Sequence, residues 1–256
     1  MRIARVLFNG SPVWATIVGE DVYHLNDVYG AQERGERLGR LSDLRLLAPA
    51  EPKKVICIGL NYALHAAESG KTIPTEPLMF FKPPTALINP GDDIIWPIGT
   101  NRIDSEAELA VVIRRKAKLI QPDTWREYVL GYTCGNDVSA RDWQDADGQW
   151  TRAKGFDTSL PLGPWLQTDV DPDNLRIRGY LNGQVRQDST TADLGHKTGK
   201  LVAFVSRFFT LEPGDILMTG TPANPGPMED GTEYTVEIEG IGRLTNRMRR
   251  PQSYFS

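Results

Sequence analysis

Short apolar runs separated by turn-forming residues dominate the hydrophobic pattern of the chain. In the N-terminal part, residues 3–9 and 13–18 form two strand-like runs around the turn sequence Gly10-Ser11-Pro12. The apolar stretch 41–50 then ends between two prolines. We therefore predict a small β-rich N-terminal domain over residues 1–50 and a larger domain over residues 51–256.

The larger domain continues with short strands, and helical spacing is confined to two segments. Residues 61–69 are typical of a short helix, with Asn61 as the N-cap and Gly70 just beyond its end. Residues 200–209 carry apolar side chains at helical spacing. Because strands and helices do not alternate, the pattern predicts a β-dominated α+β fold rather than a doubly wound sheet. Strands are predicted at residues 54–59, 78–81, 94–96, 109–113, 129–135, 177–181, 216–219 and 234–238.

Two carboxylates share one face of an otherwise apolar strand. If residues 103–113 are one strand, Glu106 and Glu108 point the same way, with Cα atoms roughly 7 Å apart. Converging carboxylates repel each other and resist desolvation, and a divalent cation removes both costs. Oxygen ligands of this kind select Mg²⁺, Mn²⁺ or Ca²⁺. The alternative is an acidic strand face that simply faces water.

A second polar segment favours the metal interpretation. Residues 131–135 are an apolar strand that ends at a glycine, and a dense group of polar residues follows it. Asp137 in this group is a candidate third carboxylate. Its alternative role is that of a turn residue or helix N-cap.

Other residues supply candidate acid–base and substrate-binding groups. His65 and Glu68 lie three apart on the predicted helix, so the carboxylate can orient the imidazole as a general base, although such pairs also occur on helix surfaces without function. Lysines at strand ends, here Lys82 and Lys154, are candidates to bind a carboxylate or enolate oxygen. Further candidate donors to a substrate are Gln144, Gly220 and Thr221.

Composition narrows the class of protein. The 256 residues are 40% hydrophobic and 24% charged, which is typical of a globular protein, and the formal net charge of −4 is not that of a nucleic-acid binder. The apolar run 109–113 is far too short to span a bilayer, and residues 1–5 show no apolar signal region. Two cysteines, Cys57 and Cys134, lack a C-x-x-C spacing, so we expect a cytoplasmic protein.

Taken in order, these motifs resemble the fumarylacetoacetate hydrolase family between about residues 54 and 240. The N-terminal unit resembles that of bacterial members described as 2-hydroxyhepta-2,4-diene-1,7-dioate isomerases. The ordered set is Gly59, Asn61, Tyr62, His65 and Glu68; Phe81, Lys82 and Pro83; Glu106, Glu108 and Leu109; Asn136, Asp137, Val138, Ser139, Ala140, Arg141, Asp142 and Gln144; Lys154 and Asp157; and Leu211, Glu212, Pro213, Gly214, Asp215, Thr219, Gly220, Thr221 and Pro222.

The resemblance implies a mixed β-roll catalytic domain, a homodimer and bound Mg²⁺ or Mn²⁺. It assigns Glu106, Glu108 and Asp137 to the metal, and His65 with Glu68, on a short lid helix, to the activation of water. Lys154, Arg141 and Gln144 are expected to help bind the substrate. The family also implies a role in the breakdown of aromatic compounds.

The resulting prediction is a divalent-metal-dependent enzyme that acts on 2-oxo or 1,3-dicarbonyl carboxylic acids through a metal-stabilised enolate. Hydrolysis of a C–C bond, of the acylpyruvate or fumarylpyruvate type, is the first expectation. The alternatives are 2-hydroxyhepta-2,4-diene-1,7-dioate isomerisation or decarboxylation, and oxaloacetate decarboxylation. Outside enzymes, the alternatives are a calcium-stabilised binding protein and an interaction module with a solvated acidic face.

Overall fold

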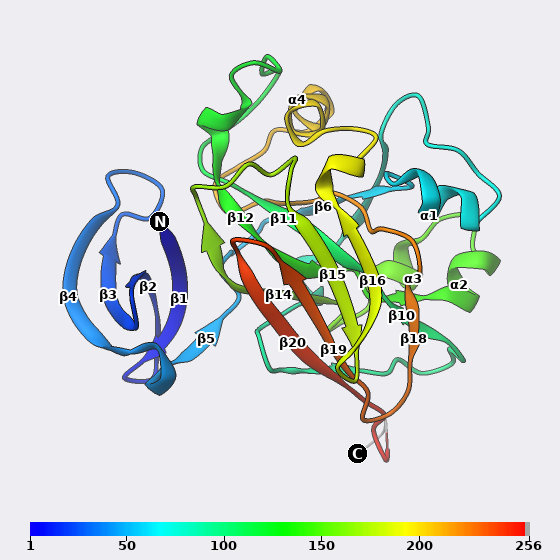
Figure 1. Cartoon of the computed structure of the whole chain (residues 1–256), viewed down its shortest axis with the longest axis horizontal. Helices are drawn as coiled ribbons and strands as arrows, with labels where there is room; N and C mark the ends of the chain where they lie inside the picture. The colour runs from blue at the N-terminus through cyan, green and yellow to red at the C-terminus, as the bar shows by residue number, and fades with distance from the viewer. Residues whose placement is uncertain (254–256) are drawn as a thin grey trace.

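A 12-stranded mixed sheet joins the N-terminal strands to the rest of the chain in the computed structural model, which describes residues 1–253 (Figure 1). In Figure 1 strands β1–β4 curl into the left part of the molecule, and the helices lie around the larger right part. Along the sheet the strands are β4 (Glu33–Arg40), β3 (Asp21–Asn26), β2 (Ser11–Val18), β1 (Arg2–Phe8), β14 (Leu160–Gln167), β12 (Val129–Asn136), β11 (Ala107–Ile113), β17 (Ile216–Met218), β6 (Val55–Gly59) and β7 (Leu78–Lys82). In addition, β5 (Arg45–Leu47) pairs with β1, and β8 (Leu87–Ile88) pairs with β14.

Two smaller sheets and a few short helices complete the described fold. The five-stranded sheet has the order β16 (Gln184–Thr190), β15 (Arg176–Leu181), β19 (Glu233–Ile238), β20 (Gly242–Arg249) and β9 (Asp93–Ile95). The three-stranded sheet has the order β13 (Ser139–Ala140), β10 (Ile103–Ser105) and β18 (Gly226–Met228). The α-helices are α1 (Ala63–Glu68), α2 (Arg141–Ala146), α3 (Thr151–Gly155) and α4 (Thr198–Phe208), and 3₁₀ turns cover Leu41–Asp43, Pro84–Ala86, Trp125–Tyr128 and Thr191–Asp193. The predicted β-dominated α+β class is confirmed.

Strand β11 is buried on both faces and separates two hydrophobic clusters. Leu109, Val111 and Ile113 belong to one cluster, whereas Ala110 and Val112 belong to the other. The predicted alternation along this strand is therefore confirmed. The prediction of one strand over residues 103–113 is wrong. The strand is interrupted at Glu106, where the chain passes from the three-stranded sheet into the large one.

The predicted first helix is present as α1, but the prediction of Asn61 as its N-cap is wrong. Tyr62 is the N-cap, and no side chain caps the helix there. The side chain of Asn61 instead donates to the carbonyl oxygens of His196 and Thr219, which ties the helix to distant segments. The predicted end is correct: Gly70 has a φ of +66° and donates to Ala67, in the arrangement that closes many helices.

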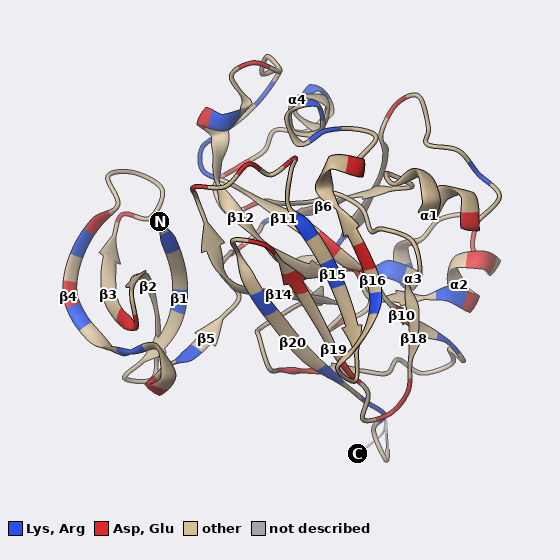
Figure 2. Ribbon diagram, viewed as in Figure 1, with Lys and Arg blue, Asp and Glu red and all other residues tan. Residues whose placement is uncertain are grey.

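Several strands escaped prediction because their sequences lack an apolar alternation. Strand β4 reads ERGERLGR and has no buried residue, and acidic and basic residues follow one another along it (Figure 2). Strand β14 contains two prolines and a glycine, although most of it is buried. Within the described chain, no helix has the length and apolar character needed to cross a membrane. Cys57 and Cys134 are both free and buried.

Gln187 on β16 connects three parts of the fold near the carboxylates. Its Oε1 accepts hydrogen bonds from the Ala107 backbone N–H (2.9 Å) and the Tyr234 hydroxyl (2.6 Å). Its Nε2 donates to Thr221 Oγ1 (2.9 Å) and to the carbonyl oxygen of Pro222 (2.7 Å). This fully buried amide therefore fixes the start of β11 against the loop that follows β17.

Replacing Gln187 by methionine keeps the side-chain volume but removes these hydrogen bonds. We expect the free energy of unfolding to fall by about 3 kcal/mol, because buried donors and acceptors lose their partners. Urea denaturation followed by circular dichroism measures the change. The control is Gln184→Met at an exposed position of the same strand, which we expect to stay within about 0.5 kcal/mol. Equal stability of the two variants would show that the Gln187 network contributes nothing.

Candidate metal and substrate site

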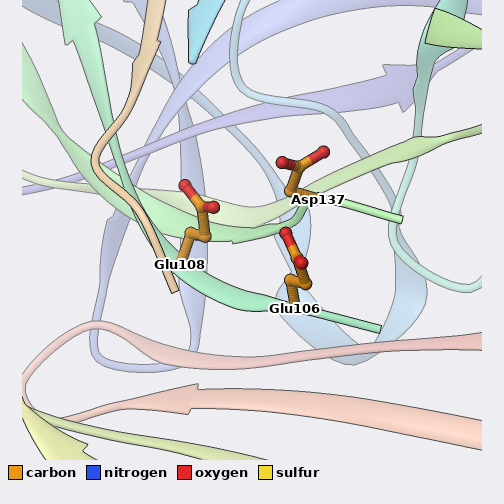
Figure 3. A group of neighbouring side chains, drawn as sticks. All are labelled: Glu106, Glu108 and Asp137. Atoms are coloured by element: carbon orange, nitrogen blue, oxygen red, sulfur yellow. The ribbon is translucent and has the colours of Figure 1, made fainter. Parts of the chain in front are cut away.

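Three carboxylates meet where β11 begins and β12 ends (Figure 3). Glu106, just before β11, and Glu108, the second residue of β11, point the same way, and Asp137 lies beside them. One oxygen from each lies within 4.8 Å of the others. The exposed fractions of Glu106, Glu108 and Asp137 are 2%, 2% and 1%, so the alternative of an acidic face open to water is wrong.

Backbone hydrogen bonds hold the two carboxylate-bearing segments together. The Asn136 side chain accepts from the Glu106 N–H at 2.8 Å, and the Glu106 carbonyl accepts from the Asp137 N–H at 3.0 Å. Both bonds form at the point where the chain leaves one sheet for the other. At the break, these two bonds therefore hold the Glu106 segment beside the Asp137 segment.

The buried acids belong to a line of alternating charges, which we call the charge chain. Lys154 Nζ lies 2.7 Å from Glu106 Oε2 and 2.8 Å from Asp137 Oδ2. Arg141 also pairs with Glu106, and its Nε donates to Asp104 at 2.9 Å. In order, the charge chain is Arg102, Asp104, Arg141, Glu106, Lys154, Asp137 and Lys82.

This environment shifts the pKa values of Glu106 and Glu108 in opposite directions. Burial opposes ionisation of Glu106, but Arg141 and Lys154 outweigh it and hold its pKa well below the usual value. Burial raises the pKa of Glu108 well above its usual value, and the charges of Asp137 and Glu106 raise it further. The Gly220 N–H, which donates to Glu108 Oε2 at 2.8 Å, offsets part of this effect.

The donor set fits a hard divalent cation. All three candidate ligands are carboxylates, which Mg²⁺ and Mn²⁺ prefer. Asp137 Oδ1 is buried and accepts no hydrogen bond, although it lies 2.8 Å from Lys82 Nζ. Glu108 lies outside the charge chain, so its negative charge is the one that a bound cation would compensate. These features match the carboxylate cluster predicted from the sequence.

The carboxylates open onto a cavity of about 540 Å³, and α1 contributes to its wall. His65 and Glu68 on this helix both line the cavity, with His65 Nδ1 3.2 Å from Glu68 Oε2. Glu68 Oε1 also accepts from the Asn224 N–H at 2.8 Å. The imidazole thus contacts a carboxylate that is itself hydrogen-bonded to the backbone of Asn224, on a distant segment of the chain.

Comparison with known proteins shows what this site resembles. Residues 54–249 match the model described as "Fumarylacetoacetate (FAA) hydrolase C-terminal", and residues 1–49 match "Rv2993c-like, N-terminal". The chain belongs to the fumarylacetoacetate hydrolase family. It is 49% identical to Protein Rv2993c of Mycobacterium tuberculosis, over 98% of each chain.

Two further members of the family carry names that refer to a reaction. The oxaloacetate tautomerase Fahd2a of Rattus norvegicus is 44% identical, covering 81% of this chain and 70% of the relative. The crystal structure of 2-hydroxyhepta-2,4-diene-1,7-dioate isomerase from Mycobacterium marinum is 41% identical. It superposes with a TM-score of 0.92 over 99% of this chain and all of that one. The family resemblance read from the sequence is confirmed, and the related proteins carry more than one activity in their names.

The structure brings most of the predicted site residues of this family member to one cavity, but not Lys82 or Gly220. The cavity is lined by His65, Glu68, Glu106, Glu108, Asp137, Arg141, Gln144, Lys154 and Thr221. Lys82 is buried behind Asp137, where its amine donates to the Ser159 carbonyl (2.9 Å) and hydroxyl (3.1 Å). It serves as a structural cation there, while the Gly220 N–H is occupied by Glu108.

Sequence reasoning missed other cavity residues. Asp104, which holds Arg141, carries the same alternation signal as Glu106 and Glu108 and was identifiable from it. Phe80 and Trp150 form an edge-to-face pair on the cavity wall, with ring centroids 5.3 Å apart. Arg186 also lines the cavity, and its strand was not predicted at all.

Replacing Glu108 by glutamine should separate metal binding from folding. The change removes one of three crowded carboxylates, so we expect the metal-free variant to be at least as stable as the unmodified protein. Mn²⁺ at 100 times its dissociation constant should stabilise the unmodified protein by about 2.7 kcal/mol and leave the variant unaffected. Denaturation with and without Mn²⁺ measures both effects.

The matched control is Asp145→Asn, which removes an exposed acid from the rim of the same cavity. It should retain the Mn²⁺ effect in full. Loss of the effect in both variants, or its persistence in Glu108→Gln, would contradict a metal site centred on the three carboxylates.

Proposed function

We propose that this protein is a Mg²⁺- or Mn²⁺-dependent enzyme that acts on 2-oxo or 1,3-dicarbonyl carboxylic acids by way of an enolate. Hydrolysis of a C–C bond in an acylpyruvate-type substrate is the proposed reaction. The observation that carries the proposal is the buried carboxylate triad at the base of a cavity that also holds the His65–Glu68 pair. A calcium-stabilised binding protein has no need of that pair.

Glu106, Glu108 and Asp137 would hold the cation. When bound, the cation supplies a Lewis acid that stabilises negative charge on a substrate oxygen. Arg141 and Lys154 line the same cavity and keep Glu106 ionised, so the ligands are ready to bind without further proton loss from that group. The Gln144 Oε1 accepts from Arg141 Nη1 at 2.7 Å and holds the guanidinium in place.

The charges around the site favour an anionic substrate. With Glu108 ionised, the charge chain and Glu108 together carry four positive and four negative groups. A divalent cation would therefore leave two positive charges in excess. A substrate carboxylate next to an enolate oxygen supplies two negative charges, which supports the 2-oxo acid class.

His65 is the proposed general base. Its ring lines the cavity, and the Glu68 carboxylate lies against Nδ1, so the other ring nitrogen is free to take a proton. In hydrolysis this proton comes from a water, which then attacks the distal carbonyl carbon. The C–C bond breaks, and its electron pair passes to the enolate of the departing 2-oxo acid.

Tautomerisation of oxaloacetate is the second candidate. It needs the same enolate and one acid–base group but no attacking water. The similarity to the rat oxaloacetate tautomerase specifically favours it. Isomerisation of a dienol, as named in the Mycobacterium marinum protein, differs again only in where the proton returns.

The decisive experiment measures both reactions in one preparation. Protein stripped with EDTA is assayed for loss of the acetylpyruvate enol absorbance and for keto–enol conversion of oxaloacetate, before and after adding Mn²⁺. We expect Mn²⁺ to restore acetylpyruvate hydrolysis. Conversion of oxaloacetate alone would establish the tautomerase instead, and no reaction of either compound would refute both the hydrolase and the tautomerase.

Replacing His65 by glutamine should lower the metal-restored rate by about 10²- to 10⁴-fold, because the general base is lost. The affinity for Mn²⁺, measured by calorimetry, should change by no more than about threefold, since no oxygen ligand is removed. The control is His24→Gln on β3, far from the cavity in sequence and fold. A collapse of Mn²⁺ affinity in the His65 variant would make His65 a ligand and not the base.

A homodimer remains part of the proposal. Strand β7 ends the described large sheet, and Leu78 and Phe81 on it are 39% and 41% exposed. Exposed apolar edge strands are usually paired or covered in native proteins, which supports self-association at an edge like this one. Light scattering should give twice the chain mass of 28.5 kDa. A monomer mass at micromolar concentration would contradict the dimer.

A further inference from the structure

Arg186 is one of two cavity cations, with Lys71, for which no ion pair is found in residues 1–253. Arg102, Arg141 and Lys154 also line the cavity, but each is paired with an acid of the charge chain. No ion pair found in residues 1–253 includes Arg186, and its guanidinium contacts the Pro225 carbonyl at a long 3.4 Å.

A β-bulge places this arginine. In the pairing of β15 with β16, Gly179 faces Gln187 and Tyr180 faces Val185, so Arg186 is the extra residue on its strand. A bulge of this kind turns a side chain away from the regular alternation and often occurs next to active sites. The neighbouring Gln187 is anchored in the protein by its hydrogen bonds, which fixes the bulge from one side.

Gly226 lacks a side chain and so lets the Arg186 side chain pack against its backbone. A Cβ at this glycine would lie 2.9 Å from Arg186 Nε and 3.1 Å from its Cγ. The aliphatic part of Arg186 therefore lies directly on the backbone of β18, and its charged end is presented beside Pro225 on the cavity wall. Lys71 lines the same cavity from the loop after α1.

We propose that Arg186 binds a second carboxylate of the substrate and so selects 2-oxo acids that carry an acid group at the far end. This inference rests on the proposed function, in which the metal and the charge chain already satisfy the 2-oxo acid end. A guanidinium can bind a carboxylate through two parallel hydrogen bonds, which gives direction as well as charge. Arg186 is thus a specificity-determining residue and not part of the acid–base chemistry.

The test is binding of matched ligand pairs to Mn²⁺-loaded protein by calorimetry. 2-Oxoglutarate is compared with 2-oxopentanoate, and 2-oxoadipate with 2-oxohexanoate; each pair differs only in a terminal carboxylate against a methyl group. We expect the unmodified protein to prefer at least one dicarboxylate over its partner by about 10- to 100-fold. Arg186→Gln should abolish this preference and leave the monocarboxylate affinities within about twofold.

Lys71→Gln is the matched variant, since it removes the same charge from another wall of the same cavity. It should keep the preference. The proposal is overturned if the unmodified protein shows no preference, if Arg186→Gln weakens both members of a pair equally, or if Lys71→Gln is the variant that loses it. If Mn²⁺ binds and no 2-oxo acid does, the substrate class proposed above fails and this inference fails with it. If Mn²⁺ itself does not bind, the metal site is what fails.

Discussion

The structure depends on pairing buried carboxylates that lie close to one another with cationic side chains. Glu106 and Asp137 are almost fully buried, and an unpaired buried charge is too costly for a folded protein to retain. The charge chain solves this problem by placing a cation between each pair of acids. Its cations come from separate parts of the chain: Arg141 begins α2, Lys154 lies on α3 and Lys82 ends β7. The two short helices are therefore required where they are, because without them the ligand strand would carry uncompensated charge.

This arrangement also explains why the three carboxylates are not equivalent. Glu106 and Asp137 each form an ion pair with Lys154, whereas Glu108 forms none and accepts a hydrogen bond from the Gly220 N–H. A site with all its negative charge neutralised by lysine and arginine would have little attraction for a cation. A site with none neutralised would not fold readily. In this fold the charges of Glu106 and Asp137 are paired with cationic side chains and that of Glu108 is not, so Glu108 would provide the attraction for a cation.

Features of the fold and the site that depend on neighbouring residues were predictable from the sequence, and features that depend on distant segments were not. Alternation along a strand is local, so the shared face of Glu106 and Glu108 followed from the sequence, as did the end of α1 just before Gly70. Contacts between distant segments were not predictable from residue patterns. Asn61 is a residue type that often caps helices, but here its side chain forms hydrogen bonds with distant segments. Lys82 resembles a substrate-binding lysine, but its amine is already paired with Asp137 and Ser159. The bulge at Arg186 depends on the pairing partner of its strand, which no single-sequence pattern reveals.

The division between the charge chain and the cavity wall bears on how one fold supports several reactions. Under the proposed function, the triad and its cations would meet the part that substrates of hydrolysis, tautomerisation and isomerisation have in common, a carboxylate beside an enolate oxygen. They cannot by themselves choose among these reactions. The choice must come from groups that meet the rest of the substrate: His65 on a six-residue helix, Phe80 and Trp150 on one wall, and Arg186 on a bulge. Of these groups only Phe80 lies on the large sheet, and His65, Trp150 and Arg186 come from other segments. These three groups can therefore change by substitution without altering the strands that carry the carboxylates, so under the proposed function the groups that select the substrate are physically separate from those that would hold the cation.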